Sequence, residues 1–370
     1  MTTELTSTER TDRTLRLAFP WGIWIRRVIL AALVVLVVVA IIKTFTLPAD
    51  AGPGELSRYT AATWRSFIIG GLSEGAVLAL IALGYSLVYG ILRMINFAHG
   101  EVFMMGGFAS YFVADRFNDN DLLSSNPAVA MIVILAVAIG VSVLVAILLE
   151  RVCYRPLRNA PRLVPLITAI GASLFLQNTA RGFFGPQARG YPRPDFLVGS
   201  WNVLGFKIDR IDLVMILVSI VLVAILDYFV SSTRTGRSMR AVALDADIAK
   251  LMGIDVDRVI VTTFAIGGVL AGVAGVMFAM RFQQISFTTG FRPGIAAFTA
   301  AVLGGIGSIR GAALGALLVG LLRSLGPALL IGFEIPSVFQ LEDAITFLVL
   351  VFVLLYRPGG LLGSAAAEKL

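Results

Sequence analysis

The chain has 370 residues, of which 58% are hydrophobic and 14% are charged, and its net charge is +7. Because so few polar residues cannot cover the surface of a soluble domain, the composition excludes an ordinary soluble protein. The single cysteine and single histidine exclude an internal disulfide and a metal site rich in either residue. The basic residues stand in short clusters between apolar runs, which is a membrane-topology signal rather than a sign of nucleic-acid binding.

Long, continuously apolar runs predict an all-α polytopic membrane protein with about ten transmembrane helices. The predicted spans are Val28–Leu47, Ser66–Gly90, Ile95–Ala114, Ala128–Leu149, Val164–Phe184, Ile211–Val230, Val259–Met280, Gly294–Ile309, Gly311–Ile331 and Val338–Tyr356. The run Gly294–Ile309 is shorter than a spanning helix usually needs, so it is either a short tilted span or a re-entrant half-helix. The number of spans is therefore eight to ten.

The charge distribution predicts the orientation of the chain. With ten spans, the clustered basic residues all fall on one side of the membrane, which the positive-inside rule makes cytoplasmic. These residues are Arg10, Arg13, Arg16, Arg26, Arg27, Arg151, Arg155, Arg158, Arg162, Arg234, Arg237, Arg240, Lys250, Arg258 and Arg357. Both termini are predicted to be cytoplasmic. Residues 1–65 are interpreted as a cytoplasmic leader with an extra, uncleaved transmembrane helix, because the polar leader is long for a signal peptide.

The segment Ser231–Arg258 is a polar, basic island between two apolar runs. Thr233 or Thr235 is expected to cap a helix through Met239–Leu244, and Asp245 or Asp247 a second short helix that ends near Gly253. Two interpretations stay open: a helix that docks into a cytoplasmic partner, or an amphipathic helix on lipid headgroups. The candidate contact residues are the apolar Met239, Ala243, Leu251 and Ile254 together with Arg237 and Arg240.

Polar residues within the apolar runs are further candidates, because polar groups at that depth need a partner or a cavity. Arg93, Asn96, His99 and Glu101 lie in or beside the stretch Gly84–Gly107. They either line a pathway or form a turn whose polar groups satisfy one another, and the turn is favoured for Arg93 and His99. The remaining candidates for the pathway or for helix contacts are Glu74, Gln177 and Asn178.

Small residues dominate the stretch Gly294–Gly320. Gly304, Gly307, Gly311 and Gly315 are close to the spacing that lets helix backbones touch, either along a pore, between subunits or within one subunit. The chain has no GxxxxGK[ST] phosphate loop and no metalloprotease or serine-hydrolase motif. The sequence therefore indicates a transport subunit without its own ATPase site, rather than an enzyme.

Four stretches carry a resemblance to a known family. They are GYSLVYGILRMINFAHGEVFMMGG, ERVCYRPLRNAPRLVPLITAIGASLFLQN, the island Ser231–Arg258, and FTAAVLGGIGSIRGAALGALLVGLL. Together they resemble the branched-chain amino acid ABC transporter permeases, specifically the first of the two permease subunits. The resemblance covers about Ser66–Leu362, so residues 66–362 are the expected permease core and 231–258 its cytoplasmic coupling loop. The resemblance places these residues in that loop: Arg234, Gly236, Arg237, Arg240, Ala241, Asp245, Lys250 and Gly253.

The resemblance implies a permease in the inner membrane of a bacterium that pairs with a second, homologous permease subunit. It also implies two cytoplasmic ATP-binding subunits, which would bind the ATP, and an extracytoplasmic solute-binding protein. The substrate would be a branched-chain amino acid or a related small polar solute, with urea and short amides as the alternative. An ion-coupled secondary transporter is a further alternative, but it would need mid-span carboxylates, and Glu74, Glu342 and Asp343 lie towards the ends of their runs.

Overall fold

A computed structural model describes residues 35–47, 59–158, 160–161, 163–203, 206–357 and 359–363. The chain forms two compact units. The first unit lies within Met1–Tyr59 and Pro327–Phe339, and the second within Thr60–Gly326 and Gln340–Leu370. The helices are α3 (Ala61–Leu92), α4 (His99–Asp119), α5 (Leu122–Ser125), α6 (Pro127–Leu149), α7 (Leu163–Phe184), α8 (Arg210–Ser232), α9 (Arg234–Leu244), α10 (Ala246–Leu251), α11 (Val256–Phe282), α12 (Phe291–Gly304), α13 (Ile309–Leu329) and α14 (Glu342–Tyr356). A π-helical turn, Glu150–Tyr154, extends α6.

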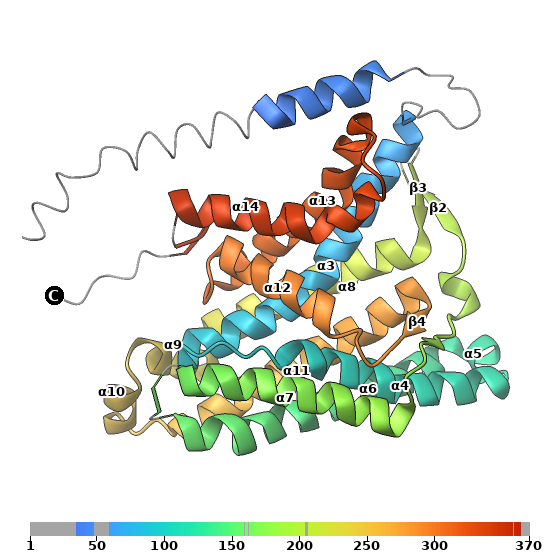
Figure 1. The fold of residues 1–370 in the computed structure, drawn as a ribbon. Coiled ribbons are helices and arrows are strands. Elements are labelled where there is room, and N and C mark those ends of the chain that lie inside the picture. Colours follow the sequence, from blue (N-terminus) through green and yellow to red (C-terminus); the bar gives the residue numbers. More distant parts are fainter. Residues whose placement is uncertain are drawn as a thin grey trace, which may run out of the picture. The chain divides into compact units, whose positions relative to one another are not determined.

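The described strands of the second unit form two small antiparallel sheets. Strand β1 (Arg189–Gly190) pairs with β4 (Gln284–Ile285), and β2 (Ser200–Val203) pairs with β3 (Phe206–Asp209). The β2–β3 hairpin precedes α8, whereas α9 and α10 follow α8 at its other end (Figure 1). Beside β1, burial raises the pKa of the Tyr191 phenol, and this hydroxyl shares a 2.9 Å hydrogen bond with Ser110 of α4.

The helices α3 and α11 form the centre of the second unit. In their most apolar windows 78% and 72% of the residues are buried, compared with 17% in α8. Glycines let α11 approach α6 closely, since a Cβ added at Gly268 or Gly272 would come within 2.8 Å of the α6 backbone. Without a hydrophobic driving force in lipid, such backbone contact is a main source of helix association.

At its β3 end, α8 is tied to both central helices. Asp212, which is buried, forms a 2.5 Å ion pair with Arg281 of α11 and accepts a 2.8 Å hydrogen bond from Ser73 of α3. Because a carboxylate between helices in a membrane protein needs such partners, these contacts fix the position of this end of α8.

The first unit contains the described part of the predicted extra helix. Val35–Thr46 is an apolar helix, and the Thr44 hydroxyl donates a 2.6 Å hydrogen bond to the Leu329 carbonyl. The Lys43 ammonium lies 4.6 Å from the centre of the Phe333 ring. Residues 28–34 of the predicted span, the leader with its arginines, and residues 48–58 lie outside the described part of the chain.

Seven described helices are long and apolar enough to cross a membrane, and α4, α12 and Val35–Thr46 account for the other three predicted runs. Two predicted boundaries are wrong. The run Ile95–Ala114 begins as a turn, because Arg93 ends α3 in the left-handed conformation, and its helix is His99–Asp119. The run Gly294–Ile309 is a helix of only 14 residues, Phe291–Gly304. A helix of this length is too short to cross the hydrocarbon core, even when it stands perpendicular to the membrane.

The glycine-rich stretch forms the tight connection between α12 and α13. The chain reverses through Gly305 and Gly307, which have φ values of +107° and +93°. A Cβ added at Gly304 would lie 1.9 Å from the Gly311 carbonyl oxygen, and one at Gly315 would lie 2.2 Å from that of Ala300. Three of the four predicted glycines, Gly304, Gly311 and Gly315, therefore lie at contacts between α12 and α13 of the same chain.

Candidate functional site

Glu101 lies in the first turn of α4 and is 1% exposed. Its Oε1 accepts hydrogen bonds from two side chains of α7, at 2.8 Å from Gln177 Nε2 and at 3.2 Å from Ser173 Oγ. Its Oε2 has no hydrogen-bond partner among the described residues. A buried carboxylate oxygen without a donor is costly, so this oxygen marks a place where a further donor is missing.

A cavity of about 250 Å³ adjoins Glu101, between α3, α4, α7 and α12. Tyr85, Ser173 and Gln177 supply the other polar side chains of its wall, and Gly290 and Gly294 supply small positions at the start of α12. The rest of the wall is apolar: Phe97, Ile170, Leu174, Phe291 and Ile295. An apolar cavity with a few convergent polar groups is the usual form of a binding site for a small molecule.

Two predicted candidates near Glu101 have structural contacts instead. Asn96 is buried and accepts a 2.9 Å hydrogen bond from Tyr154 Oη through its side-chain oxygen. His99 is buried with its ring edge-on to Tyr85, at 5.1 Å between centroids, and close against the backbone of Gly84. His99 Nε2 has no hydrogen-bond partner in the described part of the chain.

The two amides predicted on α7 have different positions. Gln177 lines the cavity and donates to Glu101. Asn178 is exposed and donates a 2.8 Å hydrogen bond to the Leu174 carbonyl of its own helix. The structure therefore brings Gln177, but not Asn178, into the candidate site.

The polar island folds as the two short helices α9 and α10. The Thr233 hydroxyl caps α9 by accepting from the Gly236 amide at 3.0 Å, and the Asp245 carboxylate caps α10 by accepting from the amides of Asp247 and Ile248. Gly253 follows α10 with φ +82°, as a left-handed C-cap glycine does. Local cap signals thus set the boundaries of this module.

One side of α9–α10 packs on the bundle and the other side is exposed. Met239, Val242 and Ala249 are buried, so the prediction that Met239 belongs to an external contact surface is wrong. Met239 instead lies on the face of α9 that is turned towards the spans. Four apolar side chains are highly exposed, and we call them the exposed apolar face: Leu244, Ile248, Leu251 and Met252. Ala243 and Ile254 are partly buried.

The basic residues of the module differ in what they contact. Arg240 donates to the Val230 carbonyl near the end of α8, and is otherwise exposed, as are Arg234, Arg237 and Lys250. Gly236 is buried against the same end of α8, where a Cβ would lie 2.3 Å from the Val230 carbonyl oxygen. Because Gly236 has no side chain, α9 can lie directly against the end of α8.

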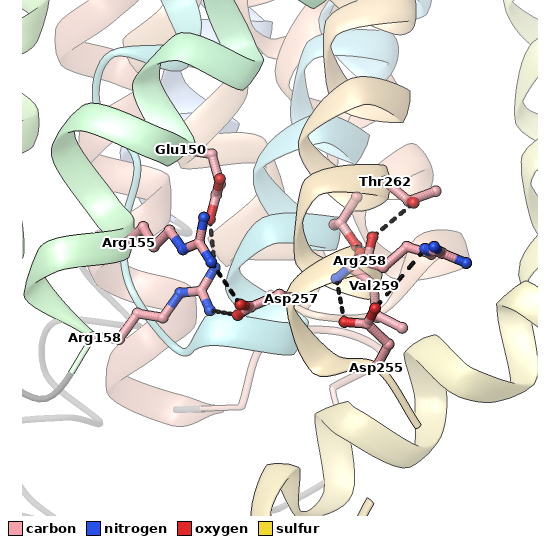
Figure 2. Close-up of polar contacts among 9 residues, drawn as sticks. Glu150, Arg155, Arg158, Asp255, Asp257, Arg258, Val259 and Thr262 are labelled. Atoms are coloured by element: carbon pink, nitrogen blue, oxygen red, sulfur yellow. Dashed lines mark hydrogen bonds and ion pairs between the residues drawn. The ribbon is translucent and has the colours of Figure 1, made fainter. Parts of the chain in front are cut away.

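An ionic cluster connects the end of α6 with the start of α11 beside this module (Figure 2). Arg158 contacts both Glu150, which is fully buried, and Asp257. Arg155 adds a 2.8 Å ion pair to Asp257. Asp255, the N-cap residue of α11, and Arg258 in its first turn form a separate, exposed pair at 3.9 Å. The buried Glu150 therefore obtains a cation, and the 150–158 segment is fixed to α11.

A second ionic cluster surrounds Arg323 of α13, whose side chain is 7% exposed. Its guanidinium donates to Glu74 of α3 and Glu342 of α14, each at 2.6 Å, and also contacts Asp343. Glu74, predicted as a candidate for the pathway, is thus a partner of a buried arginine. This contact favours a structural role for Glu74 over a place in the pathway.

Residues 67–354 match the family described as branched-chain amino acid transport system / permease component. The chain belongs to this family. It is therefore a permease component of a transport system and not itself an enzyme.

The chain covers nearly the whole length of its curated relatives. The high-affinity branched-chain amino acid transport system permease protein BraD of Pseudomonas aeruginosa is 41% identical over 311 residues, 82% of this chain and 96% of that protein. The corresponding LivH proteins of Salmonella typhimurium and Escherichia coli are each 40% identical, over 81% of this chain and 95% of theirs. A solved metal-chelate type ABC transporter in an inward-facing conformation has a TM-score of 0.40 and 16% identity, covering 90% of this chain and 99% of that one. That similarity is too low to inform the function.

The sequence does not select Tyr85 or Ser173, and it places Glu101 only among the polar candidates of Gly84–Gly107. The hydrogen-bond partners of Glu101 are on α7, 72 and 76 positions away. The signal that could have selected it is the polar face Ser173–Gln177, one helical turn apart, on a span that is otherwise apolar.

Proposed function

We propose that this permease forms half of the membrane pathway of an ATP-binding cassette importer for branched-chain amino acids or related small polar solutes. Its partners would be a second, homologous permease, two cytoplasmic ATP-binding subunits and an extracytoplasmic solute-binding protein. The names of the curated relatives support the substrate class. Both termini and the α9–α10 module would be cytoplasmic, since the basic clusters favour that side.

One observation carries the proposal: the exposed apolar face of α9–α10. Leu251 is 86% exposed, and Leu244 and Met252 are each 78% exposed, on helices whose other side is fixed to the spans. Four such side chains are an unfavourable surface in water, and they suit a groove in a partner protein. A module held against α8 by Gly236 and Arg240 can transmit a displacement of that partner, as ATP-driven transport requires.

Co-purification tests the docking part of this proposal. In the full-length chain, Leu251→Asp places a charge on the exposed apolar face without removing a buried contact, and it should reduce recovery of the ATP-binding subunits at least about tenfold, as at interface hot spots. Val198→Asp is the matched control, because Val198 is 50% exposed and precedes the β2–β3 hairpin at the opposite end of α8. Its recovery should equal that of the wild type. Unchanged assembly of Leu251→Asp would instead identify a helix on the lipid surface.

Uptake by the reconstituted importer tests the substrate class. Radiolabelled leucine, isoleucine and valine should enter vesicles in an ATP-dependent way, and urea should not. Urea uptake without amino-acid uptake would replace the proposed substrate class, and uptake without any ATP-binding subunit would refute the proposed coupling.

A further inference from the structure

The buried polar contacts of Glu101 are asymmetric. Both donors from α7 go to Oε1, whereas Oε2 is left without a partner. Holding α4 to α7 therefore uses one oxygen, and a neutral glutamine carbonyl could accept the same two bonds. A carboxylate is more costly to bury than an amide, so we expect its second oxygen to have a partner of its own.

The free oxygen lies where the cavity meets the start of α12. Glu101 lines the cavity, and a Cβ added at Gly290 would lie 2.6 Å from Oε2. Gly290 and Gly294, which have no side chain, let the start of α12 pack against Gly100 of α4, and both glycines line the cavity. This corner of the cavity is also the N-terminal end of the 14-residue helix α12, and the positive end of the helix dipole favours a negative group. In its first turn the Phe291 amide already donates to the Thr288 carbonyl, and Pro293 has no amide hydrogen.

Part of the cavity wall is aliphatic. Ile170 and Leu174 of α7 face the cavity together with Ile295 of α12. Among the residues that the structure describes, no lysine or arginine lines the cavity. The wall thus suits a branched hydrocarbon group, and Glu101 supplies the charge within reach of it.

From this geometry we propose that the cavity binds an aliphatic amino acid in transit, with its ammonium group on Glu101 Oε2. The carboxylate of the bound amino acid lies towards the N-terminal end of α12, and its hydrocarbon side chain lies against Ile170, Leu174 and Ile295. This inference rests on the proposed function and deepens it by assigning the contacts of the substrate within the membrane. An ammonium group supplies the donors that Oε2 lacks, and a charge-assisted bond in a cavity of low dielectric is strong.

Protection of a cysteine in the cavity tests the inference. Ile295→Cys is introduced with Cys153→Ser, and the full chain with its co-purified subunits is labelled with the neutral reagent methyl methanethiosulfonate. Leucine should slow the labelling, whereas 4-methylpentanoate, the same skeleton without an ammonium group, should not. Adding Glu101→Gln should raise the half-protecting leucine concentration at least tenfold, which is about 1.4 kcal/mol.

The controls separate a lost ligand contact from a damaged fold. Asp119→Asn removes a carboxylate from the exposed far end of the same helix, α4, and should leave protection unchanged. Glu101→Asp keeps the charge on a shorter side chain and should retain more protection than Glu101→Gln. If Glu101→Gln does not assemble, 4-methylpentanoate decides the question alone, since protection by it would overturn the inference.

Three further outcomes would also overturn it: a residue 295 that the reagent does not reach, equal protection by leucine in Glu101→Gln, or protection by urea but not leucine. Leucine uptake by the wild-type importer is measured in parallel. Uptake with equal protection in Glu101→Gln would overturn this inference and leave the proposed function intact. Absence of aliphatic amino-acid uptake would remove the proposed function itself.

Discussion

Replacing Arg323 with methionine would leave three carboxylates facing one another without their cation. The guanidinium is 7% exposed and contacts Glu74, Glu342 and Asp343, which are 25%, 30% and 38% exposed. Removing one partner of a fully buried ion pair costs about 3–5 kcal/mol. Because water reaches these carboxylates and screens their repulsion, we expect about 2–3 kcal/mol of lost stability.

Thermal unfolding of the detergent-solubilised chain measures this loss through tryptophan fluorescence. A change of 2–3 kcal/mol corresponds to a Tm lower by roughly 4–8 °C for a large domain. Glu74→Gln should cost less, because Arg323 keeps two carboxylates, and it should leave transport largely intact. Combining Glu74→Gln with Arg323→Met should recover part of the Tm, since one repelling charge is gone. A Tm of Arg323→Met within about 1 °C of the wild type would refute this account of the cluster.

Two other predictions concern packing and topology. Gly84→Ala should lower the Tm more than Gly140→Ala, because a Cβ at Gly84 would lie 2.0 Å from His99 Nε2 whereas Gly140 has nothing within 4 Å; equal effects would contradict the packing of His99. In a background without the native cysteine, a membrane-impermeant thiol reagent should label Ser200→Cys and spare Ser232→Cys in intact cells, and the reverse pattern would contradict the orientation expected from the basic clusters.

Features with local signals could be predicted from the sequence. The caps Thr233 and Asp245 and the left-handed Gly253 follow from residue type and spacing, and the structure has all three. The long spans follow from the lengths of apolar runs, as α6 and α8 show. In each case the determining residues are within a few positions of the feature.

Features that depend on packing could not be predicted in this way. The sequence places Arg323 in an apolar run, but its partner Glu74 is 249 positions away. Met239 is an apolar residue in a polar segment, as a contact residue would be. It is buried because it lies on the face of α9 that packs against the spans. The orphan oxygen of Glu101 depends on how α7 lies against α4, which no local pattern encodes.

The two attachments of α8 define how it can move. One end is fixed by Asp212 to Arg281 and Ser73, deep in the bundle. The other end is joined to α9 through Gly236 and the Arg240 contact with a backbone carbonyl. A shift of α9 would therefore reach that end of α8, while the Asp212 contacts hold the opposite end. We therefore expect the Asp212 end of α8 to move least when a partner displaces α9.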